Sequence, residues 1–404
     1  MNFYHFFRLF YEIFQKDDPD TVWIEKQGLL AVKIAQTFAL RADFLSPVAC
    51  QQLGRLYQHT TPVPGEAFFE LLDSYTSTEW KSNFSEIAEA PLASASIGQV
   101  HKGTLQSGER VVIKAVKKDF QKQFRSDVKQ AEKILNVAIR FYPKLKKVAN
   151  PQGILDLLNE NTLMELDLRN ETSHRNELAK IAEEANKHYD LHDVAFPKIY
   201  EELSSENVLV SEFLDGPTFD DLLTENKLSY ETLLALFRIH GYYIFGVGTF
   251  HGDIHPGNII LNDGKIWFID NGAIGRVDRV IRKGLLKFFK YMSAGDFVGC
   301  AHALYEISET EISEEAYQKF EKEFLILYAD FDGRTVAEIS LTRKMMETIR
   351  LGVLSGMTFS QGMYPIVKSL MYLDGMVLRC NPQAVLLKDM GKFIAEFEKA
   401  MEGV

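Results

Sequence analysis

The stretch TFHGDIHPGNIILNDGKIWFIDNG, Thr249 to Gly272, decides the fold. Within eight residues it gathers four polar side chains, His251, Asp253, His255 and Asn258. Apolar residues then flank an Asn-Asp-Gly turn, which predicts a β-hairpin, and Asp270 follows that hairpin. Carboxylate, amide and imidazole groups at this spacing indicate either a metal site or a phosphoryl-transfer site.

A zinc site would use His251 and His255, which are four residues apart as in helical zinc-binding pairs. However, Gly252, Pro256 and Gly257 disfavour a regular helix through these histidines. No cysteine lies nearby in the sequence. A structural zinc site is therefore the weaker interpretation.

Phosphoryl transfer needs an acid near the attacking hydroxyl or water and oxygen ligands for magnesium. Asp253 and Asn258 are five residues apart, the interval between Asp and Asn in the kinase catalytic loop H-R-D-x-x-x-x-N. Asp270 lies in IDNG, where kinases carry D-F-G. Asp253 is thus the predicted catalytic acid, and Asn258 and Asp270 are the predicted ligands of Mg²⁺, which prefers oxygen.

The remaining parts of such a site have candidates upstream. Lys114 in VVIKAV matches the strand lysine of V-A-I-K, although an ordinary solvated strand lysine also fits. Small side chains in PLASASIGQV let backbone N–H groups approach phosphate. The nucleotide-binding positions predicted there are Ala93, Ser94, Ala95, Ser96, Ile97, Gly98 and Val100. VSEFLDG resembles an inter-lobe hinge, where backbone groups near Glu212 and Leu214 would bond an adenine edge.

Periodicity predicts the order of the elements. Two strands, SIGQVHKG and ERVVIKAV, are joined by a turn at Ser107–Gly108, and a third strand covers Asn207 to Phe213. Residues Val111, Ile113 and Ala115 would share one strand face. Helices are predicted over about 20–75, over about Phe120 to Lys187, and over most of the chain after Gly216.

Composition narrows the class of protein. The 404 residues predict two lobes, and the net charge of −11 argues against non-specific nucleic-acid binding. Three scattered cysteines favour a reducing compartment, and we see neither a signal peptide nor a transmembrane span, so we expect a cytoplasmic protein. Apolar residues from Phe3 to Phe14 have helical spacing, which fits a helix docked on the body or one lying on a membrane.

Taken together, the motifs resemble the UbiB family, atypical kinase-like proteins associated with coenzyme Q biology. The A-rich loop of the family is matched at Pro91 to His101, and its H-G-D-x-H-P-G-N at His251 to Asn258. Its E-x-D signature is matched at Glu165 to Asp167, and its K-x-G-Q signature is approached by Lys33 to Gln36. The resemblance covers about Gln27 to Pro382.

The resemblance implies ATP and Mg²⁺ as cofactors, with ATP or ADP bound. Lys114 would contact the inner phosphates and pair with Glu171 on a helix. The regulatory residues that it implies are Lys33, Gln36, Glu165 and Asp167. Lys33 would meet Glu165 and Asp167 as its helix folds over the active site. Glu165, Asp167 and Glu171 also fit a solvated helix face. A lipid or quinone-precursor ligand and a peripheral membrane contact are further implied partners.

The implied fold is α+β, protein-kinase-like and two-lobed. We expect an N-terminal helical extension over 1–80, a small β-containing N-lobe over 81–215 and a mostly helical C-lobe over 216–404. The function expected is that of a Mg-dependent atypical kinase or ATPase.

Two positions depart from the family pattern. Ala35 replaces the Gly of K-x-G-Q, and Asn271 replaces the Phe of D-F-G. They keep open a pseudokinase that binds nucleotide as a switch. A small-molecule phosphotransferase of the aminoglycoside or choline type also carries H-G-D-x-H-x-x-N, but lacks the A-rich loop and the Lys33 to Gln36 element.

Overall fold

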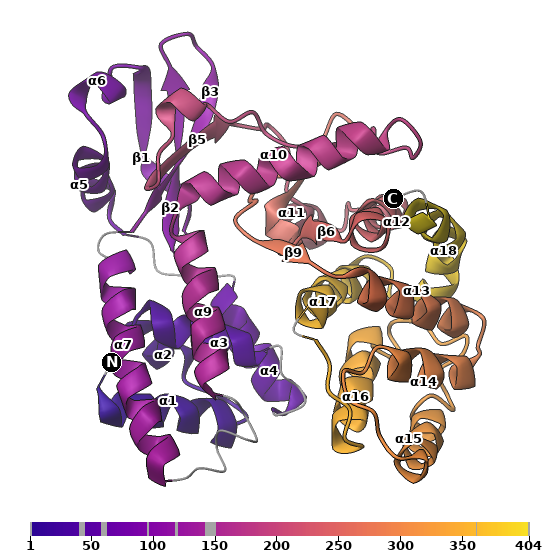
Figure 1. Cartoon of the computed structure of the whole chain (residues 1–404). Helices are drawn as coiled ribbons and strands as arrows, with labels where there is room; N and C mark the ends of the chain where they lie inside the picture. The colour runs from indigo at the N-terminus through magenta and orange to yellow at the C-terminus, as the bar shows by residue number, and fades with distance from the viewer. Residues whose placement is uncertain are drawn as a thin grey trace. The chain divides into compact units, whose positions relative to one another are not determined.

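The computed structural model describes residues 2–39, 45–57, 63–94, 97–117, 120–141, 151–360 and 362–402. The chain divides into two compact units (Figure 1). The first contains Met1–Ser173 and Pro197–Phe213, and the second contains His174–Phe196 and Leu214–Val404. The boundary therefore falls inside one helix, α10 (Leu168–Ala185). The predicted bounds 1–80, 81–215 and 216–404 stay a prediction.

A four-stranded antiparallel sheet forms part of the first unit, in the order β1-β2-β3-β5. Its strands are β1 (Phe84–Ser94), β2 (Gly98–Leu105), β3 (Arg110–Val116) and β5 (Val208–Glu212). The predicted β2–β3 hairpin is confirmed, with Gly108 at a φ of 87° in its turn. The prediction of a loop from Pro91 is wrong for Pro91 to Ser94, which end β1. Proline is tolerated there because β1 is an edge strand.

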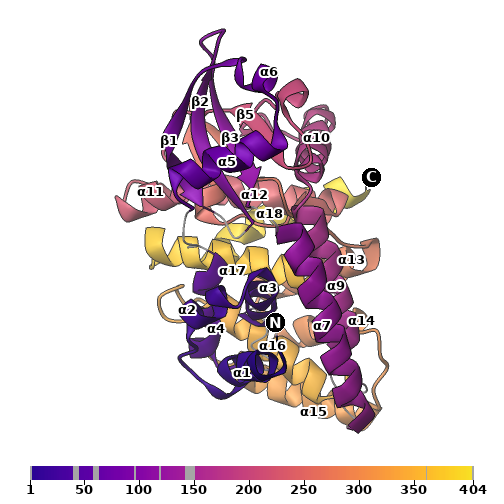
Figure 2. The same ribbon diagram turned by 90° about the vertical axis from the view of Figure 1, so that its left-hand side faces the viewer.

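One face of this sheet is covered by α5 (Gly65–Tyr75), as Figure 2 shows. Phe68 and Leu72 of α5 are fully buried in the same apolar cluster as three residues of β3, namely Val111, Ile113 and Ala115. The predicted common face of these β3 residues is thus confirmed. Because strand side chains alternate, Lys114 is directed to the opposite face.

The remaining helices of the first unit surround a second apolar cluster. They are α1 (Phe3–Gln15), α2 (Thr21–Lys26), α3 (Leu29–Ala39), α4 (Pro47–Gly54), α7 (Phe120–Phe141) and α9 (Pro151–Glu165), with a 3₁₀ turn at Arg55–Tyr57. The short helix α6 (Thr78–Lys81) and a 3₁₀ turn at Glu201–Leu203 contribute Trp80 and Leu203 to the cluster of the sheet instead. Helices α7 and α9 lie side by side in both views (Figures 1 and 2). The helical stretch predicted from Phe120 to Lys187 is therefore three helices within the described residues.

Helix α1 is docked on this cluster, as one of the two interpretations predicts. Phe6, Leu9 and Ile13 are buried on one face of the helix. Four aromatic side chains on the rest of its surface are exposed, Phe3 (60%), Tyr4 (66%), Phe7 (47%) and Tyr11 (56%). Docking thus leaves an aromatic surface uncovered.

The second unit is mostly helical. Its helices are α11 (Phe219–Thr224), α12 (Tyr230–Gly241), α13 (Arg279–Ser293), α14 (Phe297–Glu306), α15 (Glu314–Leu327), α16 (Leu341–Leu354), α17 (Met363–Cys380) and α18 (Leu386–Glu402). Its short strands are β4 (Val194–Ala195), β6 (Thr249–His251), β7 (Ile259–Asn262), β8 (Lys265–Phe268) and β9 (Ile274–Arg276), with a 3₁₀ turn at Pro256–Asn258. The predicted hairpin is confirmed as β7–β8, with positive φ at Asp263 and Gly264.

The apolar run after α12 forms a π-helical turn, Tyr242–Val247, inside the core of this unit. Against it packs α18, so tightly that a Cβ on Gly241 would lie 2.3 Å from the ring of Phe397. Helix α18 thus buries an apolar face in this core. Within the described residues, no helix combines the length and the hydropathy that crossing a bilayer requires.

Burial of His240, in α12, leads us to predict that the stability of the folded state depends on pH. It is fully buried beside Phe250, and within the described part of the chain neither ring nitrogen has a hydrogen-bond partner. This burial, aided by His251, lowers the pKa of His240 to about 3. As pH falls below about 6.5, the unfolded chain binds the proton first, so the folded state loses up to about 1.4 kcal/mol per pH unit from this group.

We expect His240→Leu to make this loss shallower between pH 6.5 and 5. Urea unfolding of the second unit at several pH values measures it. His192→Leu, at an exposed position, is the matched control and should keep the wild-type slope. An unchanged slope in His240→Leu would contradict the prediction.

Candidate active site

A first group of candidate residues, within the first unit, centres on Lys114, which lies opposite Val100 of β2 and Leu209 of β5. Its Nζ is 2.7 Å from Oε2 of Glu171, in the first turn of α10. The two side chains are only 10% and 5% exposed. The interpretations of Lys114 as a solvated strand lysine and of Glu171 as part of a solvated helix face are therefore wrong. A strand lysine held by a helix carboxylate is an arrangement that kinases use on phosphates.

The predicted small-residue loop joins β1 to β2. Ala93 and Ser94 pair with Val100 and Gln99 at the ends of these strands. Ala95 and Ser96 lie outside the described residues, and the side chain of Ile97 is buried. Gly98 is closely packed, because a Cβ there would lie 3.0 Å from the carbonyl oxygen of Ala115. Phosphate binding by this loop stays a prediction.

Gln99 and His101, in the same motif, have structural partners that the sequence did not reveal. The Gln99 amide accepts from the Val63 N–H (2.8 Å) and donates to the Val63 carbonyl (3.1 Å). His101 stacks on Phe68, with ring centroids 3.6 Å apart, and its Nδ1 lies 2.7 Å from the Ala88 carbonyl oxygen. This pair of side chains fastens the segment before α5 to the sheet.

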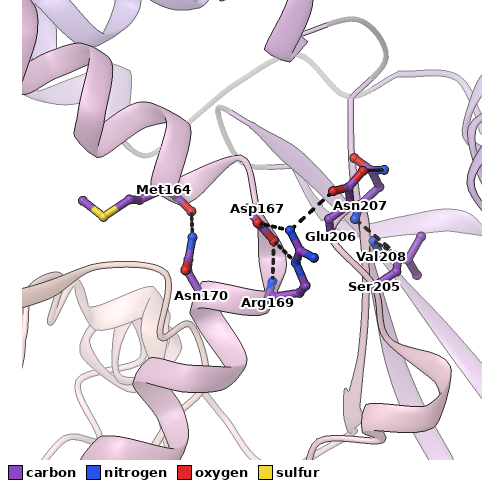
Figure 3. Close-up of polar contacts among 8 residues, drawn as sticks. All are labelled: Met164, Asp167, Arg169, Asn170, Ser205, Glu206, Asn207 and Val208. Atoms are coloured by element: carbon purple, nitrogen blue, oxygen red, sulfur yellow. Dashed lines mark hydrogen bonds and ion pairs between the residues drawn. The ribbon is translucent and has the colours of Figure 1, made fainter.

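The E-x-D signature lies at the junction of α9 and α10 (Figure 3). Lys33 of α3 pairs with Glu165. Asp167 instead accepts two side-chain hydrogen bonds from Arg169, at 2.8 and 2.6 Å, and these bonds lower its pKa. The expectation that Lys33 meets both acids is thus corrected: Arg169, two residues along, already occupies Asp167.

Two further contacts bear on this junction. Arg169 also reaches Glu206, 3.5 Å away, so the junction is joined to the turn before β5 (Figure 3). Gln36, the last residue of the K-x-G-Q-like motif, donates from its buried amide to the Leu56 carbonyl at 2.8 Å. A regulatory role for these residues stays a prediction.

The predicted hinge residues have backbone partners. The Glu212 N–H donates to the Lys198 carbonyl, and the Phe213 N–H donates to the Arg110 carbonyl. The contact of an adenine edge with Glu212 and Leu214 stays a prediction.

A second group of candidate residues lies in the predicted catalytic loop, within the second unit. Its 3₁₀ turn, Pro256–Asn258, begins at Pro256, and the side chain of His255 caps the turn by accepting from the Gly257 N–H at 3.0 Å. Asn258 donates from its amide to the Asp253 carbonyl at 3.1 Å. The loop is therefore held by its own side chains, and Asp253 and Asn258 belong to one rigid turn.

His251 connects this loop to Asp270. Its Nδ1 accepts the Asp253 N–H at 3.1 Å, which places the ring proton on Nε2. The Nε2–H group then donates to the Asp270 carbonyl. Complete burial lowers the pKa of His251, so the neutral tautomer that this bridge requires is favoured near pH 7. The bridge places the predicted catalytic acid and one predicted metal ligand in one hydrogen-bonded unit.

Asp270 and Asn271 form a tight turn after β8. The Asp270 Oδ1 accepts the Gly272 N–H at 3.0 Å. Asn271 is buried and donates from its side-chain amide to the Phe268 carbonyl at 3.2 Å. The backbone carbonyl oxygen of Asn271 lies 3.2 Å from Nδ1 of His174. Where D-F-G has an apolar contact, this chain therefore has a polar one. Two oxygen-bearing side chains, Asn258 and Asp270, fit the donors that Mg²⁺ takes in kinases.

One charged neighbour of Asp253 was missed from the sequence. Lys368 of α17 lies 3.0 Å from the Asp253 carboxylate. It is 115 residues beyond Asp253 in the chain, and no local pattern links the two positions.

The buried lysine–glutamate pair, the Asp–Asn loop and the aspartate after the hairpin define an atypical kinase-like protein. The family model described as the ABC1 atypical kinase-like domain matches residues 55–304. The chain belongs to this family.

Relatives and solved structures agree with this assignment. The chain is 28% identical to the uncharacterized protein slr0889 of Synechocystis, over 80% of this chain and 81% of that one. It is 25% identical to a probable protein kinase UbiB of Erwinia tasmaniensis, over 94% of this chain and 70% of that one. The Mycobacterium tuberculosis protein Rv3197, solved with erythromycin, superposes with a TM-score of 0.57 at 21% identity, covering 82% and 83% of the two chains. The predicted α+β, kinase-like fold and the UbiB resemblance are confirmed.

Proposed function

We propose that this protein binds ATP with Mg²⁺ and transfers the γ-phosphoryl group to water or to a small or lipid-associated acceptor. The observation that carries the proposal is the buried contact between Lys114 and Glu171. A buried ammonium held by one carboxylate is fixed in position, as contact with the inner phosphates requires. A protein without phosphate chemistry has little reason to bury such a pair, because desolvating both charges is costly.

The roles follow from the chemistry of each group. Lys114 neutralises the inner phosphates, and backbone groups of the β1–β2 loop approach them. Asn258 and Asp270 would hold Mg²⁺, which would offset the charge of the phosphates. The oxygen of the attacking hydroxyl or water bonds to the γ-phosphorus, and Asp253 accepts its proton. The bond between the γ-phosphorus and the β–γ bridging oxygen breaks, and ADP leaves with the electron pair of that bond.

The acceptor is proposed from family membership. The UbiB resemblance supports a hydrophobic, quinone-related or lipid-associated acceptor. Purified protein with Mg²⁺ and ATP should release phosphate slowly, and phospholipid vesicles should raise the rate. The enzymatic proposal would be overturned if the protein released no phosphate either with or without vesicles. If ADP–Mg²⁺ nevertheless raised the melting temperature, a nucleotide-binding switch would be favoured.

We further propose that the exposed aromatic surface of α1 makes the peripheral membrane contact. The rings of Phe3 and Phe7 contact each other in a tilted arrangement, with centroids 4.6 Å apart, and Tyr4 and Tyr11 of the same helix are also exposed. Phenylalanine and tyrosine on one helix surface partition into the interfacial region of a bilayer. The double variant Phe3→Ser, Phe7→Ser should bind phosphatidylcholine vesicles about tenfold more weakly in sedimentation, because two apolar side chains leave the lipid.

Two exposed apolar side chains of the second unit provide the matched control. Val280 (67% exposed) and Leu354 (76% exposed) are the sites of the double serine variant. This variant should bind vesicles as wild type does. Equal vesicle binding by the α1 variant and the wild type would contradict a role for α1.

A further inference from the structure

The catalytic loop lacks the cation that the kinase signature places beside its aspartate. In H-R-D-x-x-x-x-N an arginine precedes the aspartate, and in this chain that position is Gly252. A side chain has little room there, because a Cβ on Gly252 would lie 3.2 Å from the carbonyl carbons of both Ala273 and Ile274. A positive partner for Asp253 must therefore come from another segment.

Helix α17 supplies such a partner. The Nζ of Lys368 lies 3.0 Å from Oδ1 of Asp253, and the two side chains are 14% and 29% exposed. Oδ1 itself is buried and accepts no well-aligned hydrogen bond from the described residues. The interaction at this oxygen is thus an ion pair, and the part of the Asp253 side chain that remains exposed does not include Oδ1.

The same helix contacts the loop a second time. Tyr372, one turn after Lys368, packs edge-on against His255, with ring centroids 5.4 Å apart. The Lys368 ammonium lies 5.7 Å from the centroid of that tyrosine ring. The backbone of Asp253 is already fixed on both sides, by His251 and by Asn258.

We infer that Lys368 is the positioning residue for Asp253. Resting on the proposed function, this assigns the orientation of the catalytic carboxylate to a lysine from a distant helix. Lys368 holds Oδ1, and the other carboxylate oxygen is left to accept the proton of the attacking hydroxyl or water. That proton moves to Asp253 as the new O–P bond forms, so a rotated carboxylate would slow the transfer step without weakening ATP binding.

Lys368→Met tests the inference because methionine keeps much of the side-chain volume and removes the charge. We expect kcat for phosphate release to fall between about 10- and 100-fold, since small misplacements of a reacting group cost this much. The KM for ATP should stay within about twofold, because the ion pair that Lys368 makes is with the Asp253 carboxylate, which binds no phosphate in the proposed mechanism. Lys368→Arg, which restores a cation, should recover most of the lost rate.

Lys344 provides the matched control. It is a lysine of the same unit, 17% exposed, and its Nζ lies 3.6 Å from Asp330, outside the catalytic loop. Lys344→Met should keep the wild-type kcat. A wild-type kcat in Lys368→Met, or an equal loss in Lys344→Met, would overturn the inference.

A crystal structure of Lys368→Met separates this inference from the proposed function. A rotated Asp253 side chain supports the positioning role even if the wild type releases no phosphate. An Asp253 side chain with the wild-type rotamer overturns the role, whatever the activity. If the wild type releases no phosphate but the Asp253 side chain is rotated in Lys368→Met, the proposed function fails and the positioning role still stands.

Discussion

Asp270→Asn is expected to lower Mg-dependent phosphate release from ATP by about 100- to 1,000-fold, the range seen when one preorganised charge-stabilising group is lost. The carboxylate is the stronger of the two proposed Mg²⁺ ligands, and an amide carries no charge to hold the cation. Phosphate release at saturating ATP, measured over a range of Mg²⁺ concentrations, tests this. A partial recovery at high Mg²⁺ would identify weakened metal binding as the cause.

The same change should leave the fold intact. Oδ1 of Asp270 accepts the Gly272 N–H, and an asparagine oxygen can do the same. Asp278→Asn is a matched control, because Asp278 caps α13 by accepting from the Val280 and Ile281 N–H groups, and asparagine is an equally good cap. Wild-type turnover by Asp270→Asn would remove the proposed metal site from the chemistry.

Glu171→Gln should both abolish turnover and destabilise the first unit. It leaves the buried ammonium of Lys114 without the carboxylate 2.7 Å away, and breaking a buried ion pair typically costs about 3–5 kcal/mol. Urea unfolding of the first unit measures the loss. Glu398→Gln breaks an exposed pair, with Lys290, of similar length and should cost less than about 1 kcal/mol.

The double variant Lys114→Met, Glu171→Leu separates folding from catalysis. Replacing both charges by apolar side chains of similar volume is often neutral for stability. We therefore expect this variant to regain most of the lost stability and none of the turnover. Turnover at the wild-type rate would show that the pair serves the fold alone.

Local chemistry explains which elements the sequence predicted. The β7–β8 hairpin follows from the Asn-Asp-Gly turn, and Asp263 and Gly264 adopt the positive φ values that such a turn demands. The β2–β3 hairpin and the buried face of β3 follow from alternation. In contrast, β1 lacks clear alternation, since most of its side chains are partly or fully exposed. Its proline, Pro91, therefore led to the prediction of a loop.

Long-range pairing explains what the sequence could not predict in the site. Asp253 and Asn258 were identified because their spacing is local. Lys368 approaches Asp253 from 115 residues away, so only packing reveals it. The contact of Asp167 with Arg169 is local, and the sequence could have predicted it. An aspartate two residues before an arginine at the start of a helix has a charged partner within reach.

The π-helical turn before β6 determines more than the end of α12. Gly248 donates to the Tyr243 carbonyl, five residues back, and adopts a φ of 91° before β6 begins. Successive strand residues point to opposite faces, so a turn shorter by one residue would direct His251 away from the Asp253 N–H and the Asp270 carbonyl. The wide turn acts as a spacer that sets the phase of the strand. Changes of side chain within it should be tolerated far better than changes of its length.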